Sequence, residues 1–134
     1  MEDQEETWNT LKDQDLQDSG KEKLDSLKNS IAELKTLIDG RKELSKEVLK
    51  DAEKVKMEIN NFITENKQVF DKEGIREQIL LKQKQVEVSE VQLKEKVSCW
   101  QDIAKLKQEL REQERELTDK ESRKKMFDKI LEDN

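Results

Sequence analysis

Residues 24–69 read LDSLKNSIAELKTLIDGRKELSKEVLKDAEKVKMEINNFITENKQV. If Leu24 occupies position a of a seven-residue repeat, apolar residues recur at positions a and d through seven unbroken heptads. Eleven of the fourteen a and d residues are apolar, and three or four such heptads already indicate a coiled coil. This stretch therefore decides the fold class that the sequence predicts.

The a and d residues form a predicted oligomerisation seam. Ile31 and Ile38 at a, together with leucines at d, favour a parallel pair of helices, and Asn66 at a can bond its mate in such a pair. Arg41 and Ser45 interrupt the seam, and we interpret them as a tolerated weak spot rather than as a partner contact. The predicted seam comprises Leu24, Leu27, Ile31, Leu34, Ile38, Val48, Ala52, Val55, Ile59, Phe62, Asn66 and Val69.

Large apolar residues also occupy flanking e and g positions. A two-stranded coiled coil leaves such residues exposed, and exposed apolar surface of this extent usually marks a binding surface. We therefore expect either a heteromeric partner helix or a bundle of more than two helices. The candidate partner face comprises Leu37, Leu44, Leu49, Ile63 and Phe70.

The composition agrees with an extended helical chain. Of the 134 residues, 45% are charged and 31% are apolar, which is too little apolar side chain for a compact monomer. The absence of proline permits very long helices. The predicted fold class is all-α, an elongated coiled coil.

The heptad frame ends near Gly74, because the next a and d sites would be Glu73 and Arg76. One glycine without proline or Asn-Gly is a weak turn signal, so the sequence favours long helices with a register break near Gly74. The alternative is a long helical hairpin, which the similar lengths of the two arms keep open.

The second half of the chain has a less regular apolar pattern. Ile79, Val86, Leu93 and Trp100 recur every seven residues, and the register then slips. The predicted second-half seam comprises Ile79, Val86, Leu93, Val97, Trp100, Ile103, Leu106, Leu110, Leu117, Phe127 and Leu131.

Three segments follow from these patterns. Residues 1–18 carry seven acids and one base and form an acidic tail, frayed or partly helical, in which Trp8 caps the helix or contacts a partner. A capping box at Ser19 predicts a helix start. Residues 19–73 form the regular heptad coiled coil and residues 74–134 the second, less regular coiled-coil helix.

The residue types exclude most chemistry. The chain has no histidine and a single cysteine, Cys99, and its three glycines are isolated, so we expect no enzyme activity, metal, cofactor or small-molecule ligand. Outside the acidic tail the charges balance at 26 acids and 26 bases, which argues against nucleic acid as a partner. No apolar run is long enough for a membrane span, and the lone cysteine indicates an intracellular protein, cytoplasmic or nuclear.

In its composition and periodicity the chain resembles small coiled-coil subunits of kinetochore, spindle-pole or vesicle-tethering complexes. The resemblance implies a structural subunit that assembles with other coiled-coil chains, homomeric or heteromeric. The alternative hypothesis is a regulatory adaptor that uses its acidic tail to bind a basic partner.

Overall fold

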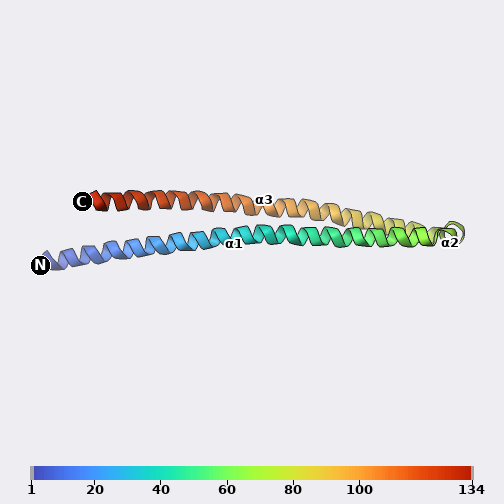
Figure 1. The fold of residues 1–134 in the computed structure, drawn as a ribbon, viewed down its shortest axis with the longest axis horizontal. Helices are drawn as coiled ribbons and strands as arrows, with labels where there is room; N and C mark the ends of the chain where they lie inside the picture. The colour runs from blue at the N-terminus through green and yellow to red at the C-terminus, as the bar shows by residue number, and fades with distance from the viewer. Residues whose placement is uncertain (1, 134) are drawn as a thin grey trace. The chain divides into compact units, whose positions relative to one another are not determined.

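The computed structural model describes the backbone of residues 2–133 and the side chains of residues 20–133. This part of the chain is all-α and contains no strand. Helix α1 spans Glu2–Glu65, the short helix α2 spans Lys67–Lys72, and α3 spans Ile75–Asp133 (Figure 1). Helices of this length are possible because proline, which costs about 3 kcal/mol inside a helix, is missing from the sequence.

Helix α1 begins at Glu2, and its backbone continues through Ser19, where the capping box predicts a helix start. The preceding residues are mostly good helix formers such as Glu, Gln, Leu and Lys, so nothing in them requires the helix to stop. The predictions for the side chains of Trp8 and Ser19 concern residues outside the described side chains.

The chain reverses direction around α2, and a helix that continues through Gly74 is therefore a wrong expectation. Helix α2 ends where the amide nitrogens of Glu73 and Gly74 both donate to the carbonyl oxygen of Val69, at 2.9 and 3.0 Å. The carbonyl of Gly74 then accepts from the amide of Gln78 at 2.9 Å, which begins α3. Two residues thus separate α2 from α3.

Gly74 permits this turn because it lacks a Cβ atom. A Cβ built at Gly74 would lie 2.8 Å from Cδ1 of Phe70, closer than real Cβ atoms approach, and 3.2 Å from its Cα, which is a tight contact. Gly74 and Phe70 are both buried, so the aromatic ring closes over the bare glycine. The turn signal is therefore a pair of residues four apart, not the lone glycine.

The chain divides into two compact units. The terminal unit consists of Met1–Leu37 and Leu106–Asn134, and the turn unit consists of Ile38–Lys105. Each unit contains a part of α1 and a part of α3. The turn unit also contains α2.

The terminal unit has an apolar packing line on both helices. In α1, Leu24, Ile31 and Leu34 are 6–7% exposed. In α3 the residues that are partly shielded from solvent recur at spacings of four and three, which is the spacing of one helix face. These residues are Leu106, Leu110, Gln113, Leu117 and Lys120.

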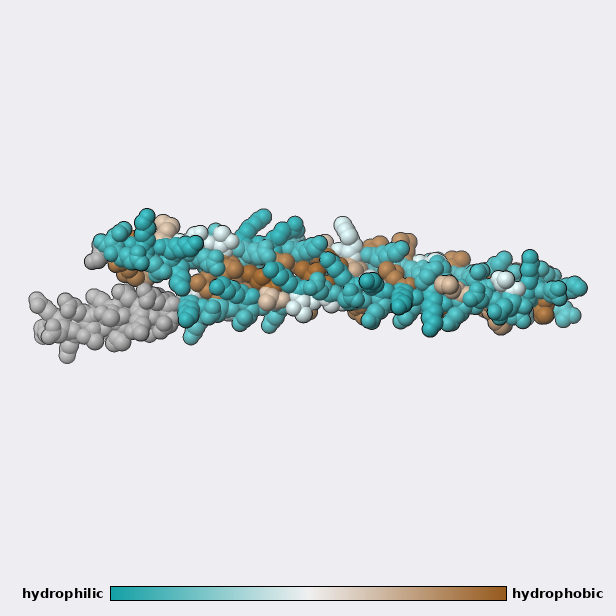
Figure 2. All heavy atoms as spheres, in the orientation of Figure 1, coloured by the Kyte–Doolittle hydropathy of each residue, from teal (hydrophilic) through white to brown (hydrophobic). Residues whose placement is uncertain are grey.

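The turn unit pairs a mainly apolar line of α1 with a mainly polar line of α3. The α1 line includes the buried Ile38 and Phe70, whereas the α3 line includes the half-buried Gln85 and Gln92. Figure 2 shows hydrophobic residues in brown where helices meet and others on the outer surface. The surface residues decide what this unit offers to a partner.

Candidate functional site

A charged cluster joins the two helices of the turn unit. Nη1 of Arg41 lies 2.6 Å from Oε1 of Glu95, and Nε of Arg41 lies 2.9 Å from Oδ2 of Asp102. The side chains of Arg41 and Glu95 are only 16% and 19% exposed. Ser45 and Cys99 are buried at the same place, and Sγ of Cys99 lies 4.0 Å from the carbonyl oxygen of Arg41. We call these five residues the Arg41 layer.

The Arg41 layer favours the charged form of Glu95. Hydrogen bonding from Arg41 is the main cause that lowers the pKa of Glu95, and Ser45 contributes in the same direction. The hydrogen bonds that Arg41 donates to Glu95 and Asp102 raise the pKa of Arg41. A guanidinium between two carboxylates suits its forked donors and fixes the relative position of the two helices.

Two of the five residues of this layer, Arg41 and Ser45, stand out in the sequence as interruptions of the predicted core. Their interpretation as a weak spot misses the two acidic partners of Arg41, which lie 54 and 61 residues away. The available signal was the spacing of Glu95, Cys99 and Asp102, which places two acids and a thiol on one face of a helix.

The packing line of α1 changes its heptad frame at this layer. Up to Ser45 the shielded residues occupy a and d sites, and from Leu49 onward they occupy a and e sites. The change results from two successive spacings of four, Arg41 to Ser45 to Leu49. The shielded residues of α1 are Leu24, Leu27, Ile31, Leu34, Ile38, Arg41, Ser45, Val48, Leu49, Ala52, Lys56, Ile59, Ile63, Asn66 and Phe70, together with Ser30 at a g site.

The packing line of α3 changes frame at the same layer. Its spacings alternate between three and four, except at Glu95, Cys99 and Ile103, where two spacings of four follow one another. An added spacing of four shifts the packed face around a helix. Because α1 and α3 both shift at the Arg41 layer, they stay matched on either side of it.

The frame change decides where the predicted seam residues lie. The seam residues that are buried are Leu24, Ile31, Leu34 and Ile38. Those that are half-buried are Leu27, Val48, Ala52, Ile59 and Asn66. Val55, Phe62 and Val69 are exposed, because the packed face has moved from d to e beyond Ser45.

The candidate partner face separates into two groups. Phe70 is buried, and Leu49 and Ile63 are half-buried, all within the turn unit. Leu37 and Leu44 are exposed. Three of the five flanking residues therefore serve packing within the chain, and two stay on the surface.

Asn66 bonds within its own helix. Its side-chain Nδ2 donates to the carbonyl oxygen of Phe62 at 2.9 Å, and its backbone has φ −110° and ψ 23° where α1 gives way to α2. Bonding to a mate across a parallel pair stays a prediction, since the structure contains one chain. In this chain the amide satisfies a carbonyl near the end of α1.

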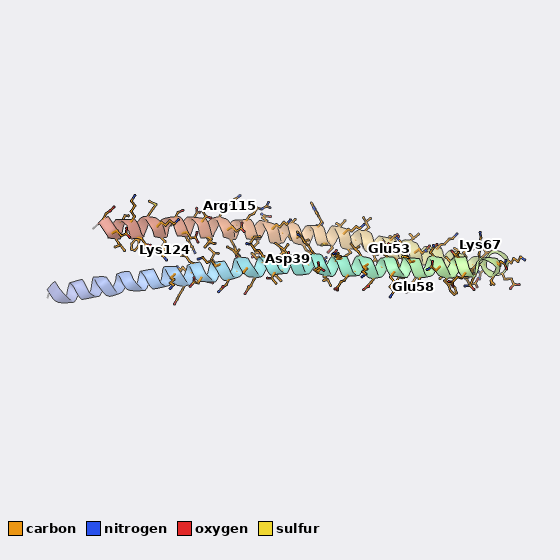
Figure 3. The ribbon with its side chains drawn as sticks, viewed as in Figure 1. Asp39, Glu53, Glu58, Lys67, Arg115 and Lys124 are labelled. Atoms are coloured by element: carbon orange, nitrogen blue, oxygen red, sulfur yellow. The ribbon has the colours of Figure 1, made fainter. Side chains whose placement is uncertain are left out.

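Polar side chains of α3 face α1 in the turn unit. Nε2 of Gln85 donates to the carbonyl oxygen of Lys56 at 3.2 Å, and Nζ of Lys56 donates to Oε1 of Gln92 at 3.2 Å. Nε2 of Gln92 donates in turn to Oε2 of Glu53 at 3.1 Å. Figure 3 shows Glu53 among the charged side chains along these helices. Hydrogen bonds therefore help to hold this part of α3 against α1, beside the half-buried Leu81 and Val88.

The apolar residues of the same part of α3 lie on the surface. Leu93 is 63% exposed and Trp100 is 71% exposed. We define the α3 stripe as Ile79, Val86, Leu93, Val97 and Trp100, all exposed. The remaining second-half seam residues divide into the half-buried Ile103, Leu106, Leu110 and Leu117 and the exposed Phe127 and Leu131.

A second set of exposed apolar residues lies on α1. We define the α1 stripe as Val55, Phe62 and Val69, which are spaced by seven residues and exposed. The ring of Phe62 meets that of Phe70 edge-on, with centroids 5.7 Å apart and an angle of 64° between the planes. One face of Phe62 is thus supported by the turn, and the rest stays accessible.

The described residues form neither a metal site nor a membrane span. Among the described residues, no group of three or more acids and cysteines is arranged to hold a metal ion. No described helix is long and apolar enough to cross a membrane. Comparison of the chain with protein-family models, curated proteins and solved structures found no match.

Proposed function

We propose that this protein is a structural coiled-coil subunit that assembles with other helical chains in a larger complex. The observation that carries the proposal is the α3 stripe, in which apolar side chains recur along one helix and remain exposed. Monomeric proteins seldom expose an apolar patch of more than a few hundred Å². A regular helical stripe of this kind is the form in which a partner helix is bound.

The packing of the turn unit supports the same proposal. Polar side chains such as Gln85 and Gln92 of its α3 line bond to α1, and the apolar side chains of the α3 stripe remain exposed for another helix. The chain resembles coiled-coil subunits of kinetochore, spindle-pole and vesicle-tethering complexes in its composition and periodicity, and this resemblance agrees with the proposal.

The proposal is tested by a charge in the stripe and a matched charge beside it. Leu93→Glu places a carboxylate where a partner helix would desolvate it, whereas Gln101→Glu adds the same charge at an exposed site outside the stripe. We expect Leu93→Glu to lose the association and Gln101→Glu to keep it, as measured by light scattering and by co-purification. Circular dichroism should show unchanged helix content for both variants. Full association of Leu93→Glu would contradict the proposal.

The acidic tail supports a regulatory adaptor as the second candidate. Its seven acids and one base within residues 1–18 could hold a basic partner by charge. Deletion of residues 1–18 separates the two functions. A scaffold subunit keeps its helical partners after the deletion, and an adaptor loses its basic partner, with the loss increasing at low salt.

A further inference from the structure

The α3 stripe carries an apolar hollow of the shape that receives a side chain from a second helix. The hollow has a volume of about 450 Å³ and is lined by Ile79, Lys82, Gln83, Val86 and Glu87. Four of these residues stand at i, i+3, i+4 and i+7, which is the arrangement of a hole in knobs-into-holes packing. The hollow can therefore receive an apolar side chain from a second helix, and Ile79 and Val86 are the apolar residues that such a side chain would contact.

A second copy of the same helix supplies that knob when it runs antiparallel. Suppose that Val86 of one copy lies beside Leu93 of the other. In antiparallel helices the numbering rises along one helix as it falls along the other, so Ile79, seven residues before Val86, then lies beside Trp100, seven residues after Leu93. The same alignment brings Val97 of the second copy over the centre of the hollow. By symmetry, each copy fills the hollow of the other, which is the isologous contact of a two-fold dimer.

A parallel pair lacks this complementarity. In parallel register the hollow would face Gln83 of the second copy instead of Val97, and Glu90 would face its own counterpart. Like charges directly opposed across a helical interface are destabilising. The antiparallel arrangement instead places Glu90 beside Ser89 and Leu93 of the second copy.

Charge also permits the antiparallel pair. Residues 75–104 contain five acids and five bases, so two copies do not repel through net charge. Glu87 and Lys94 follow Val86 and Leu93 by one residue and flank the stripe on the same side. Antiparallel pairing places Glu87 of each copy near Lys94 of the other, although Glu87 also lies 3.8 Å from Lys84 in its own chain.

We propose that the α3 stripe binds the α3 stripe of a second copy of this chain in antiparallel orientation, with Val97 of each copy seated in the hollow of the other. The proposal rests on the proposed function and names the partner for its principal surface. Homodimers with two-fold symmetry are the commonest protein oligomers.

The first test measures mass and orientation on the full chain. Sedimentation equilibrium should give a dimer, and Leu93→Glu should raise its Kd at least about a hundredfold while Gln101→Glu leaves it unchanged. A spin label at Gln101, in a Cys99→Ser background, reports orientation. The antiparallel pair places the two labels about 23 residues apart along the helix axis, roughly 35 Å, whereas parallel labels lie within about 20 Å. A short distance would overturn the proposal.

The second test exchanges charges. Glu87→Lys and Lys94→Glu should each weaken the dimer by bringing like charges together, and the double variant should recover wild-type affinity. Glu90→Leu should tighten the dimer, because it removes a charge from the paired face. Failure of the double variant to recover would overturn the antiparallel alignment.

The outcomes distinguish this proposal from the function on which it rests. A wild-type chain that is monomeric at about 100 μM, or a Leu93→Glu chain that still dimerises, would overturn the second copy as partner. If such a monomer binds a different helical chain through Leu93, the assembly function stands. If neither self-association nor any helical partner depends on Leu93, both proposals fail.

Discussion

The terminal unit and the turn unit use the same two helices differently. In the terminal unit, α1 buries Leu24, Ile31 and Leu34, and the packing line of α3 there contains Leu106, Leu110 and Leu117. In the turn unit, α1 packs mainly apolar residues, while the packing line of α3 includes polar residues beside apolar ones. The polar residues are Gln78, Gln85, Gln92, Glu95 and Asp102, and the others are Leu81, Val88, Cys99 and Ile103. Apolar residues of one helix can thus either hold the chain together or remain exposed for association. Substitutions in the two units should therefore differ in their effect on the stability of the chain.

The largest effect is expected from a charge in the terminal unit. Leu34→Asp puts a carboxylate at a site that is 6% exposed, and we expect a loss of more than about 4 kcal/mol in the free energy of unfolding. Leu93→Asp, on the exposed α3 stripe, should change it by less than about 0.5 kcal/mol when the chain is dilute enough to be monomeric. Urea unfolding measures both. Similar losses would remove the distinction between the two units.

Substitutions at the neighbouring residues Ile63 and Phe62 in the turn unit should lower stability by different amounts. Ile63 is half-buried, whereas Phe62 is 51% exposed. In the unshifted heptad frame Phe62 would be the buried d residue and Ile63 the flanking e residue, so the structure reverses the two. Ile63→Asp should cost about 2–3 kcal/mol of stability, and Phe62→Asp about 1 kcal/mol through its contact with Phe70. Thermal unfolding of the two variants side by side gives the order. A larger cost at Phe62 would mean that the frame continues unshifted past Ser45.

Two glycines provide a matched pair of substitutions. Gly74→Ala should lower stability by about 1–3 kcal/mol because the added Cβ collides with Phe70. Gly40→Ala should raise it by about 1 kcal/mol, since nothing lies within 4 Å of its Cβ and alanine favours a helix. Denaturant unfolding measures the changes, and Phe70→Ala should relieve much of the Gly74→Ala cost. A harmless Gly74→Ala would show that the turn does not need the close approach.

The smallest effect concerns pH. Arg41 lowers the pKa of Glu95 below its ordinary 4.5 in the folded chain, so the unfolded chain binds more protons and stability rises with pH in this range. The contribution is fully present above about pH 4.5 and is lost as the pH falls through the lowered pKa. Glu95→Gln should therefore show a shallower loss of stability below pH 4.5 than wild type, in unfolding curves taken across that range. The exposed Glu90→Gln is the control, and an equal slope in both variants would count against the role of Arg41.

Much of the helical fold follows from the sequence, and several contacts do not. The absence of proline and the heptads from Leu24 to Ile38 predict the long helix that the structure contains. The frame change at Ser45 is harder to predict, because Val48 and Leu49 are both apolar and either can continue the line. The turn depends on the distance between Gly74 and Phe70, and the partners of Arg41 lie more than fifty residues away. Such contacts require the three-dimensional arrangement.

The coincidence of the two frame changes has a consequence for alignment. A regular heptad repeat does not fix the alignment of two paired helices, because sliding one helix by seven residues restores the same pattern of neighbours. In the turn unit, Ser45 and Cys99 mark discontinuities in both repeats within one layer. A slide of seven residues would separate the discontinuities and carry Arg41 away from Glu95. Within the turn unit, the pairing of α1 and α3 therefore has a single preferred alignment, which the Arg41 layer sets.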